Sequence, residues 1–414
     1  MVVLKNVNVF TGDSDSVLTN QEVIIDNDVI KDIRQVSECT FDNDEVLDLT
    51  GCTLTPGFIE CHMHPFMHEI TQKDLRMGDS RADGTPLPNK DFYTAYRGVA
   101  ALQKALWNGF TTVYDGGGIN NMDIALRDAI NLGYIEGPDY YTVGQQITAW
   151  PTHHKGLGKV AAGPWGMREA VRERLFWAVD MIKIENSAPA RAYGRTMEKS
   201  AFTVEELQAC TDEAHSAGLL VQAHARGAVA VVNSVKGGCD IVVHGTGIDE
   251  EGLELMVKNN TWLYTTAAII PSIPDPEWQA YKPTRVGEML KRTGVLQEES
   301  LKKAYKAGIR MALASDWGLA TSTFGQNARE MIQMKRIGMS NFECLQIGTS
   351  NAADSLGQGD RIGRIKVGYK ADFAGFMKNP LEELEVIMNP AIVIKSGEII
   401  RNEYSAYEEN GDRL

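Results

Sequence analysis

The sequence is short of basic residues. It has 41 lysines and arginines against 55 aspartates and glutamates, which gives a formal net charge of −14 and an isoelectric point near 5.1. Proteins that bind nucleic acid use clustered lysines and arginines to neutralise phosphates and release counterions. The acidic balance therefore argues against a nucleic-acid partner.

Long uncharged apolar runs are also missing. No stretch offers the 18 or so apolar residues that a membrane-spanning helix needs. The first residues, MVVLKNVNVFTGDSDS, do not combine a basic segment, a long apolar run and a small-residue cleavage site. We therefore expect a cytoplasmic protein without a membrane partner.

Paired cysteines are absent as well. The six cysteines form no C-x-x-C motif, so neither a thiolate zinc knuckle nor a small disulfide scaffold is indicated. With 43% hydrophobic and 23% charged residues, the chain has the composition of a well-packed globular protein. Its 414 residues suit one large domain with a smaller one.

Strand-like runs punctuated by turn residues occupy both ends of the chain. The N-terminal runs are VVLKNVNVF, EVIIDNDVIKDI with a turn at Asn27 and Asp28, and EVLDLTGCTLTP. The C-terminal runs are RIGRIKVGYKADFAGF and AIVIKSGEIIRNEYS. Such runs predict β-strands. Two β-rich ends around a different middle predict one composite β-sandwich domain made of residues 1–56 and 360–414.

Between the ends, short apolar runs alternate with helical patterns, which predicts βα units around a parallel sheet. The runs cover residues 57–64, 110–117, 140–144, 180–186, 219–225, 240–246, 261–267 and 310–316. Eight is the number that closes a βα barrel. We therefore predict an α/β fold, with a TIM-like (β/α)8 barrel over residues 57–359. In one connecting segment, Thr203 with Glu206 predicts a capped helix start and Gly218 its end.

Polar residues end several of the predicted barrel strands. His62 and His64 lie two residues apart on the first strand, so both side chains project to the same side and can chelate one metal ion. Taken alone, this H-x-H motif also fits two hydrogen-bonded strand residues. Four later runs end similarly, with Lys183, His224, His244 and Asp316. Barrel enzymes carry catalytic groups at these strand ends, so the whole set predicts a metal site.

Lys183 is the informative member, because an ammonium group buried among apolar neighbours is costly and tends to lose its proton. A neutral buried amine is a nucleophile and can add carbon dioxide to form a carbamate, whose two oxygens can each hold a different ion. The alternative is an ion pair with Glu185, which lies two residues on and on the same face of the strand.

The segments PGFIECHMH, MIKIEN, QAHA, VVHGT and ALASD together resemble the amidohydrolase superfamily, in its binuclear branch with a carbamylated lysine. The resemblance covers nearly the whole chain and is strongest to prolidase-like and imidazolonepropionase-like members, which include dipeptidases and carboxypeptidases. The mononuclear deaminase branch is less similar, since it lacks the lysine and has a glutamate shortly after the histidine that corresponds to His224.

This resemblance implies a binuclear metal centre. His62, His64 and Asp316 are expected to bind the more buried ion, and His224 and His244 the other, with the carbamate of Lys183 bridging them. Zinc is the default expectation, although these ligand types also suit manganese, iron and cobalt. Asp316 is the expected proton carrier, and His244 the neutral histidine that stabilises the oxyanion.

Three residues are candidate substrate contacts. Arg226 follows His224 by two residues and can project into the same barrel mouth, where its planar fork suits a substrate carboxylate. The alternative is a pair with Asp249 or Glu250. Dipeptidase-like relatives carry a T-G-G-H segment where this chain reads ITAWPTHHKGLG. His154 is the expected counterpart of that histidine and His153 an addition, unless both are ordinary loop residues.

The predicted function is hydrolysis of a peptide-like amide, in a dipeptide or an N-acyl amino acid, by a metal-activated hydroxide. A small-molecule amide is then the substrate, and relatives favour a homo-oligomer. Three alternatives stay open at this point. The same site could cleave a cyclic amide, lactone, urea or phosphotriester; the enzyme could be a mononuclear deaminase; or an inactive barrel could bind a metabolite.

Overall fold

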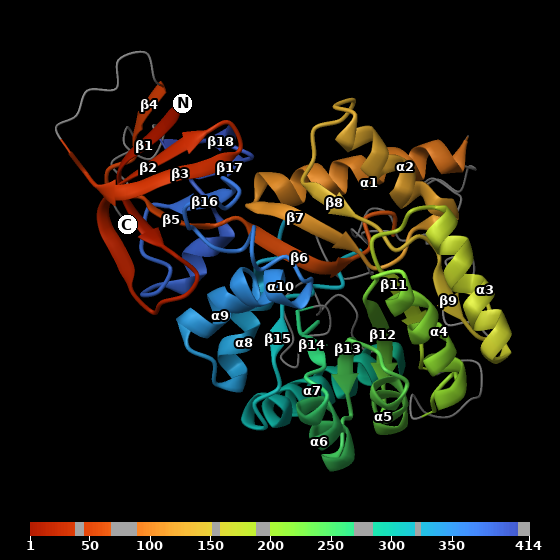
Figure 1. Ribbon diagram of the computed structural model, residues 1–414. Helices are drawn as coiled ribbons and strands as arrows, with labels where there is room; N and C mark the ends of the chain where they lie inside the picture. The colour runs from red at the N-terminus through yellow and green to blue at the C-terminus, as the bar shows by residue number, and fades with distance from the viewer. Residues whose placement is uncertain are drawn as a thin grey trace. The chain divides into compact units, whose positions relative to one another are not determined.

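The structure is a computed structural model of the whole chain, and it describes residues 1–37, 45–67, 89–150, 158–187, 199–268, 285–318 and 324–404. The chain divides into two compact units (Figure 1). Unit 1 comprises Met1–Glu60, Leu102–Val113 and Gly325–Leu414, and unit 2 comprises Cys61–Ala101 and Tyr114–Phe324. The domain boundaries predicted after residues 56 and 359 stay a prediction.

Unit 1 contains an eight-stranded sheet that both ends of the chain build together, in the order β18-β17-β16-β5-β1-β2-β3, with β4 paired to β1. Its strands are β1 (Val2–Phe10), β2 (Val17–Asp26), β3 (Val29–Gln35), β4 (Glu45–Asp48), β5 (Thr53–Pro56), β16 (Phe373–Phe376), β17 (Ile392–Lys395) and β18 (Glu398–Asn402). All the predicted terminal strands are present. Antiparallel β2 and β3 turn at Asn27, whose φ of 57° suits an asparagine.

Alternating apolar residues form the core of this sheet, including Leu4, Val23, Leu54, Phe373 and Ile392. Three short helices, α8 (Arg329–Met334), α9 (Asn341–Ile347) and α10 (Ser350–Ser355), also belong to unit 1. The terminal sheet is thus a separate β-rich element, as the sequence predicts.

The eight predicted barrel strands are all present. They are β6 (Phe58–Met63), β7 (Phe110–Asp115), β8 (Asp139–Tyr141), β11 (Ile182–Glu185), β12 (Val221–Arg226), β13 (Ile241–Thr246), β14 (Trp262–Tyr264) and β15 (Met311–Ala312). Two further strands, β9 (Gln146–Thr148) and β10 (Gly158–Val160), extend the parallel sheet beyond β11. The sequence did not predict these two, and β15 is shorter than the predicted run.

Two sets of hydrogen bonds join the three-stranded sheet β6-β7-β8 to the parallel sheet. Asp180 N donates to Thr142 O at 2.8 Å, just before β11 and just after β8. Cys61 N donates to Leu313 O, and Asp316 N donates to His62 O at 2.8 Å. The eight strands therefore form a ring, which confirms the TIM-like barrel.

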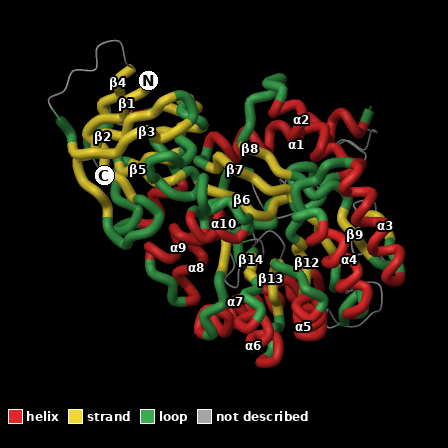
Figure 2. The backbone as a smooth tube through the Cα atoms, viewed as in Figure 1, coloured by secondary structure: helices red, strands yellow, loops and turns green. Residues whose placement is uncertain are grey.

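Helices alternate with the barrel strands along the chain (Figure 2). They are α1 (Lys90–Trp107), α2 (Met122–Asn131), α3 (Gly163–Phe176), α4 (Val204–Ser216), α5 (Ala228–Lys236), α6 (Glu250–Lys258) and α7 (Arg285–Lys306). Helix α4 confirms the predicted capping box, because Thr203 accepts from Glu206 N while Glu206 accepts from Thr203 N. The chain leaves this helix at Gly218, whose φ is +76°.

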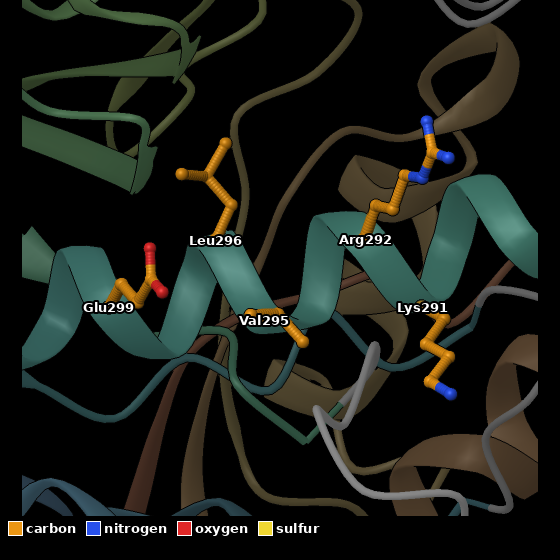
Figure 3. Close-up of a pocket in the computed structure, with 5 residues that line it drawn as sticks. All are labelled: Lys291, Arg292, Val295, Leu296 and Glu299. Carbon is orange, nitrogen blue, oxygen red and sulfur yellow. The ribbon is translucent and has the colours of Figure 1, made fainter.

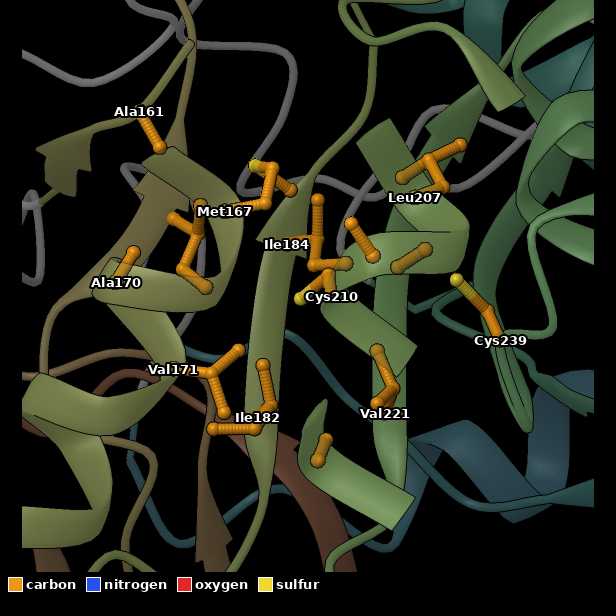
Figure 4. Close-up of a cluster of buried hydrophobic side chains, with 14 of the residues drawn as sticks. Ala161, Met167, Ala170, Val171, Ile182, Ile184, Leu207, Cys210, Val221 and Cys239 are labelled. Atoms are coloured by element: carbon orange, nitrogen blue, oxygen red, sulfur yellow. The ribbon is translucent and has the colours of Figure 1, made fainter. Parts of the chain in front are cut away.

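Apolar side chains of α3 and α4 pack against β11 and β12 (Figure 4). Ile182 and Ile184 of β11 belong to this cluster. Because strand side chains alternate between faces, Lys183 and Glu185 must point to the opposite face, toward the barrel interior. The outer packing of β11 thus determines that its two charged residues face the site.

Two further features concern membrane-spanning helices and disulfide bonds. Among the described residues, no helix is long and apolar enough to cross a membrane. The five cysteines in that part of the chain are free and buried, at positions 52, 61, 210, 239 and 344. The absence of a disulfide among them agrees with the sequence-based expectation.

Candidate metal centre

The structure brings His62, His64 and Asp316 together at one end of the barrel. The Nε2 atoms of His62 and His64 lie 3.6 and 3.3 Å from Asp316 Oδ1, and all three residues are buried. Two ligand atoms bound tetrahedrally to one zinc ion at about 2.1 Å lie roughly 3.3–3.5 Å apart. The spacing of these three groups therefore fits a single divalent ion, as the H-x-H motif predicts.

Gly116, which follows β7, makes room for this arrangement. A Cβ atom added there would lie 2.6 Å from His62 Cε1 and 2.7 Å from His64 Cε1, closer than carbon atoms pack in proteins. Any side chain at this position would displace both imidazole rings. The need for glycine at this position follows from the histidine pair, but no local sequence signal at Gly116 indicates it.

Gln222 holds the ring of His62 in a defined orientation. His62 Nδ1 lies 2.9 Å from Gln222 Oε1. The carbonyl oxygen can only accept, so Nδ1 carries the proton and Nε2 is left with a lone pair for an ion. A second hydrogen bond of this kind is typical of histidines that bind metal. Gln222 lies two residues before His224 on β12. Side chains two residues apart on a strand point to the same face, so the sequence also indicates that Gln222 points into the barrel.

Lys183 lies beside this group, with Nζ 3.5 Å from His62 Nε2. It is 1% exposed, and burial lowers the pKa of its amine to about 8 despite the opposing charges of Glu185 and Asp316. Glu185 approaches His224 Nδ1 at 3.7 Å, and within the described ranges no ion pair joins Glu185 to Lys183. A substantial neutral fraction of the amine is therefore present near neutral pH, as carbamate formation requires.

His224 and His244 form a second group. His224 Nδ1 and His244 Nε2 are 2.9 Å apart, and the ring of His244 is 6.5 Å from that of His62. His244 has a φ of +74°, a conformation that is uncommon for a residue with a side chain. Its Nδ1 has two neighbours, Thr266 Oγ1 at 2.8 Å and an Arg226 guanidinium nitrogen at 3.2 Å.

Charge at the centre is distributed unevenly. Burial raises the pKa of Asp316, but the rings of His62 and His64 outweigh this and hold it well below its ordinary value. Burial lowers the pKa of His244 well below its usual range, and Arg226 lowers it further. Burial also lowers the pKa of His62, to about 3. Asp316 is thus an ionised carboxylate, and His62 and His244 are neutral imidazoles, the protonation state that metal ligands need. The pKa of His64 is raised instead, because the hydrogen bond and charge of Asp316 outweigh the effect of burial.

Arg226 is buried against the end of β13. Its guanidinium donates to Thr246 Oγ1 at 3.3 Å as well as toward His244, and its main-chain N donates to Ser187 Oγ at 2.6 Å. Asp249 instead caps α6 by accepting from Gly252 N. Across the described ranges no ion pair links Arg226 to Asp249 or Glu250, the two partners considered from the sequence. His153 and His154 lie outside the described residues.

Helix α7 contacts the same strand ends. Gln297 Nε2 donates to His244 O at 2.7 Å and to Thr265 O at 2.9 Å, and Gln297 Oε1 accepts from Thr246 Oγ1. On another face of α7, a pocket of about 550 Å³ is lined by Lys291, Arg292, Val295, Leu296 and Glu299 (Figure 3). Sequence reasoning missed Gln297, because nothing local in the sequence relates it to β13.

Known proteins share this architecture. The chain matches the model of the amidohydrolase family over residues 53–400. The ochratoxinase of Aspergillus niger is 27% identical over 370 residues, covering 82% of this chain and 73% of that protein. The imidazolonepropionase of Bacillus cereus is 24% identical over 388 residues, covering 86% and 82%. A Xaa-Pro dipeptidase crystallised with bound methionine has a TM-score of 0.84 at 26% identity, covering 96% and 99%.

These similarities agree with the barrel and with the buried histidine and aspartate cluster, which is a candidate site for the divalent ions that this family generally uses. The match extends through most of the chain, and the similar proteins include a Xaa-Pro dipeptidase. The chain therefore belongs to the amidohydrolase family, as a prolidase-like and imidazolonepropionase-like member, and it is an enzyme that hydrolyses carbon–nitrogen bonds.

Proposed function

We propose that this enzyme cleaves a peptide-like amide, in a dipeptide or an N-acyl amino acid, with two divalent ions. The observation that carries the proposal is the meeting of the His62, His64 and Asp316 cluster with Lys183 and with the adjacent His224 and His244 pair. One ion accounts for the first cluster alone. The second pair and the buried amine of Lys183 supply ligands for a second ion.

In this proposal His62, His64 and Asp316 hold one ion and His224 and His244 hold the other. Lys183, after its neutral amine adds carbon dioxide and loses a proton, would be a further ligand through its carbamate. When bound, such ions supply a nucleophile at neutral pH by lowering the pKa of a water molecule, and they polarise the scissile carbonyl. Zinc is the ion we propose, because histidine and carboxylate ligands suit it.

The chain's own residues divide the remaining work. Asp316 is ionised at neutral pH, so it can accept a proton as the nucleophile attacks and pass it to the leaving amine. His244 stays neutral and is held by Gln297 through its main chain, so as a ligand it would act on the developing oxyanion through the second ion rather than by a hydrogen bond of its own. Arg226 supplies a permanent positive charge at the strand ends for a substrate carboxylate.

The relatives support an amide substrate through their names, which include a Xaa-Pro dipeptidase and an imidazolonepropionase. His153 and His154, which lie outside the described residues, remain proposed substrate contacts. A cytoplasmic location and a homo-oligomeric assembly also remain predictions.

A hydrolysis screen tests the proposal. Dipeptides and N-acyl amino acids with varied leaving amino acids would be compared, at equal metal loading, with lactams, lactones, ureas and phosphotriesters. We expect the peptide-like amides to be the best substrates and two ions to be bound per chain. Faster turnover of a lactone, urea or phosphotriester would refute the substrate class, and ammonia release with one ion per chain would indicate a deaminase.

A further inference from the structure

His244 Nδ1 has two neighbours that make opposite demands on its proton. The guanidinium of Arg226, 3.2 Å away, has no acceptor and can only donate. The hydroxyl of Thr266, 2.8 Å away, can donate or accept. A neutral imidazole carries one proton, on either Nδ1 or Nε2. The partner that engages Nδ1 therefore determines which nitrogen of His244 has a lone pair.

These two arrangements differ in their ability to bind an ion. If Arg226 donates to Nδ1, the ring proton is on Nε2, which then donates to His224 Nδ1 across the 2.9 Å between them. If Nδ1 donates to Thr266 Oγ1, the lone pair is on Nε2, where it can ligate. A hydrogen bond from the second ring nitrogen to an acceptor is the usual support of a metal-binding histidine. Only the second arrangement makes His244 a ligand through Nε2.

Arg226 is buried, and the charges of Asp316 and Glu185 favour its charged form without a direct ion pair to either. It is 9% exposed, and in the described part of the chain it has no carboxylate partner within ion-pair distance. Its guanidinium contacts are the ring of His244 and the hydroxyl of Thr246, which in turn donates to Gln297. Since a buried cation is costly unless an anion pairs with it, an incoming carboxylate would be a better partner than either neutral group.

We propose that Arg226 couples recognition of a substrate carboxylate to metal ligation by His244. A carboxylate engages the guanidinium and draws it from Nδ1. The ring keeps one proton, which moves from Nε2 to Nδ1 by exchange with solvent and is then donated to Thr266. Nε2 is thereby available to the second ion. This coupling rests on the proposed function, in which the substrate carries a carboxylate and His244 binds an ion.

Linkage makes the coupling reciprocal: the carboxylate tightens the second ion, and the ion tightens the carboxylate, by the same factor. Because the contact that changes is one hydrogen bond to a charged group, we expect each affinity to change by about 10–150-fold. A compound that lacks the carboxylate leaves Arg226 on Nδ1 and should not change ion affinity.

The test is ion retention rather than turnover. The zinc-loaded enzyme is titrated with a chelator, alone and with each member of a panel of amino acids and N-acetyl amino acids, and with the C-terminal amide of each. We expect free carboxylates to raise the chelator concentration needed to remove the second ion by about 10–150-fold, and the amides to leave it unchanged. Equal retention with acid and amide, or no effect of any acid, would overturn the proposal.

Variants separate this coupling from direct ligation of the ion by the carboxylate. Arg226→Met should retain the second ion more tightly without any ligand and should lose the response to carboxylates. Thr266→Val should retain it less tightly, because Nδ1–H loses its acceptor. Arg172→Met, which removes an exposed cation of α3, is the matched control and should behave as the wild type. A carboxylate response that persists in Arg226→Met would show direct ligation and refute the coupling.

The tautomer of His244 gives a second readout. In ¹⁵N-histidine-labelled protein, the wild type without carboxylate should show His244 protonated on Nε2, and Arg226→Met should show it protonated on Nδ1. The same tautomer in both would contradict the proposal. The two proposals can fail separately. If the enzyme cleaves only ureas or lactones but still retains its second ion better with carboxylates, the proposed amide substrate is refuted and the coupling is supported.

Discussion

Replacing Asp316 by asparagine tests the role of this carboxylate. The substitution changes one oxygen to an amide nitrogen and leaves an oxygen to occupy the position of Oδ1, 3.3 Å from His64 Nε2 and 3.6 Å from His62 Nε2. Asparagine can therefore still face the ion, but it cannot accept a proton. Asp316 is only 4% exposed, so bulk water does not readily replace it as a proton acceptor.

The size of the effect follows from the protonation state of the wild type. The pKa of Asp316 lies well below its ordinary value, because the rings of His62 and His64 outweigh the effect of burial. The carboxylate is thus fully ionised at neutral pH, and its whole contribution as a base is lost on substitution. General acid–base catalysis contributes about 10²–10⁴-fold, so kcat should fall by that factor, equivalent to about 2.7–5.4 kcal/mol.

Steady-state kinetics on the best substrate of the screen would measure this loss, with metal content and circular dichroism recorded for the same preparations. Asp128→Asn, which removes an exposed carboxylate from α2, controls for the loss of one negative charge and should retain kcat. A fully metal-loaded Asp316→Asn enzyme with more than about a tenth of the wild-type kcat would be incompatible with a general base.

Three further predictions follow from the same contacts. Gln222→Met should weaken zinc binding by about 10–100-fold, because His62 loses the partner that orients it; unchanged chelator resistance would show that Gln222 does not orient the ring. Native mass spectrometry should detect one added carbon dioxide per chain, absent from Lys183→Arg, and Lys183→Arg should bind fewer ions; an unmodified, fully active wild type would exclude the carbamate. Thr203→Ala should lower the free energy of unfolding by about 0.5–2 kcal/mol in urea titrations, because α4 loses its N-cap, and equal midpoints would contradict this.

The barrel was predictable because each of its strands corresponds to a short apolar run that can be recognised in the sequence by itself. Seven of the eight barrel strands are buried on both faces, and β8 at its central residue, so their apolar runs are visible in the sequence. Strands β9 and β10 read QIT and GKV, so each has only one strongly apolar residue and leaves no apolar run in the sequence. Strand β15 is shorter than its apolar run, although the chain beyond it still bonds to both neighbours, with Thr266 N donating to Ala314 O and Cys61 N to Leu313 O.

The site was predictable where a single rule places a side chain. Alternation along a strand placed His62, His64 and Lys183 on the inner face, and the same rule applied to β12 also indicates Gln222. The partners of Arg226 were not predictable. Its position at the end of β12 is local, but the choice between His244 and a loop acid depends on the path of the chain after β13, which turns Asp249 into the cap of α6.

Backbone strain is the part of the site that lies beyond any local pattern. His244, Thr266 and Asp316 have φ values of +74°, +48° and +55°, and each such conformation costs about 1–3 kcal/mol unless its surroundings enforce it. Hydrogen bonds enforce two of them directly: Gln297 donates to His244 O, and Asp316 N donates to His62 O. Because these bonds come from α7 and β6, distant in sequence, no local propensity indicates them. Residues that turn away from the strand direction can aim their side chains across the barrel mouth instead of along the wall. The strain thus accounts for how groups from separate strands, His244 and Asp316 among them, converge on one centre.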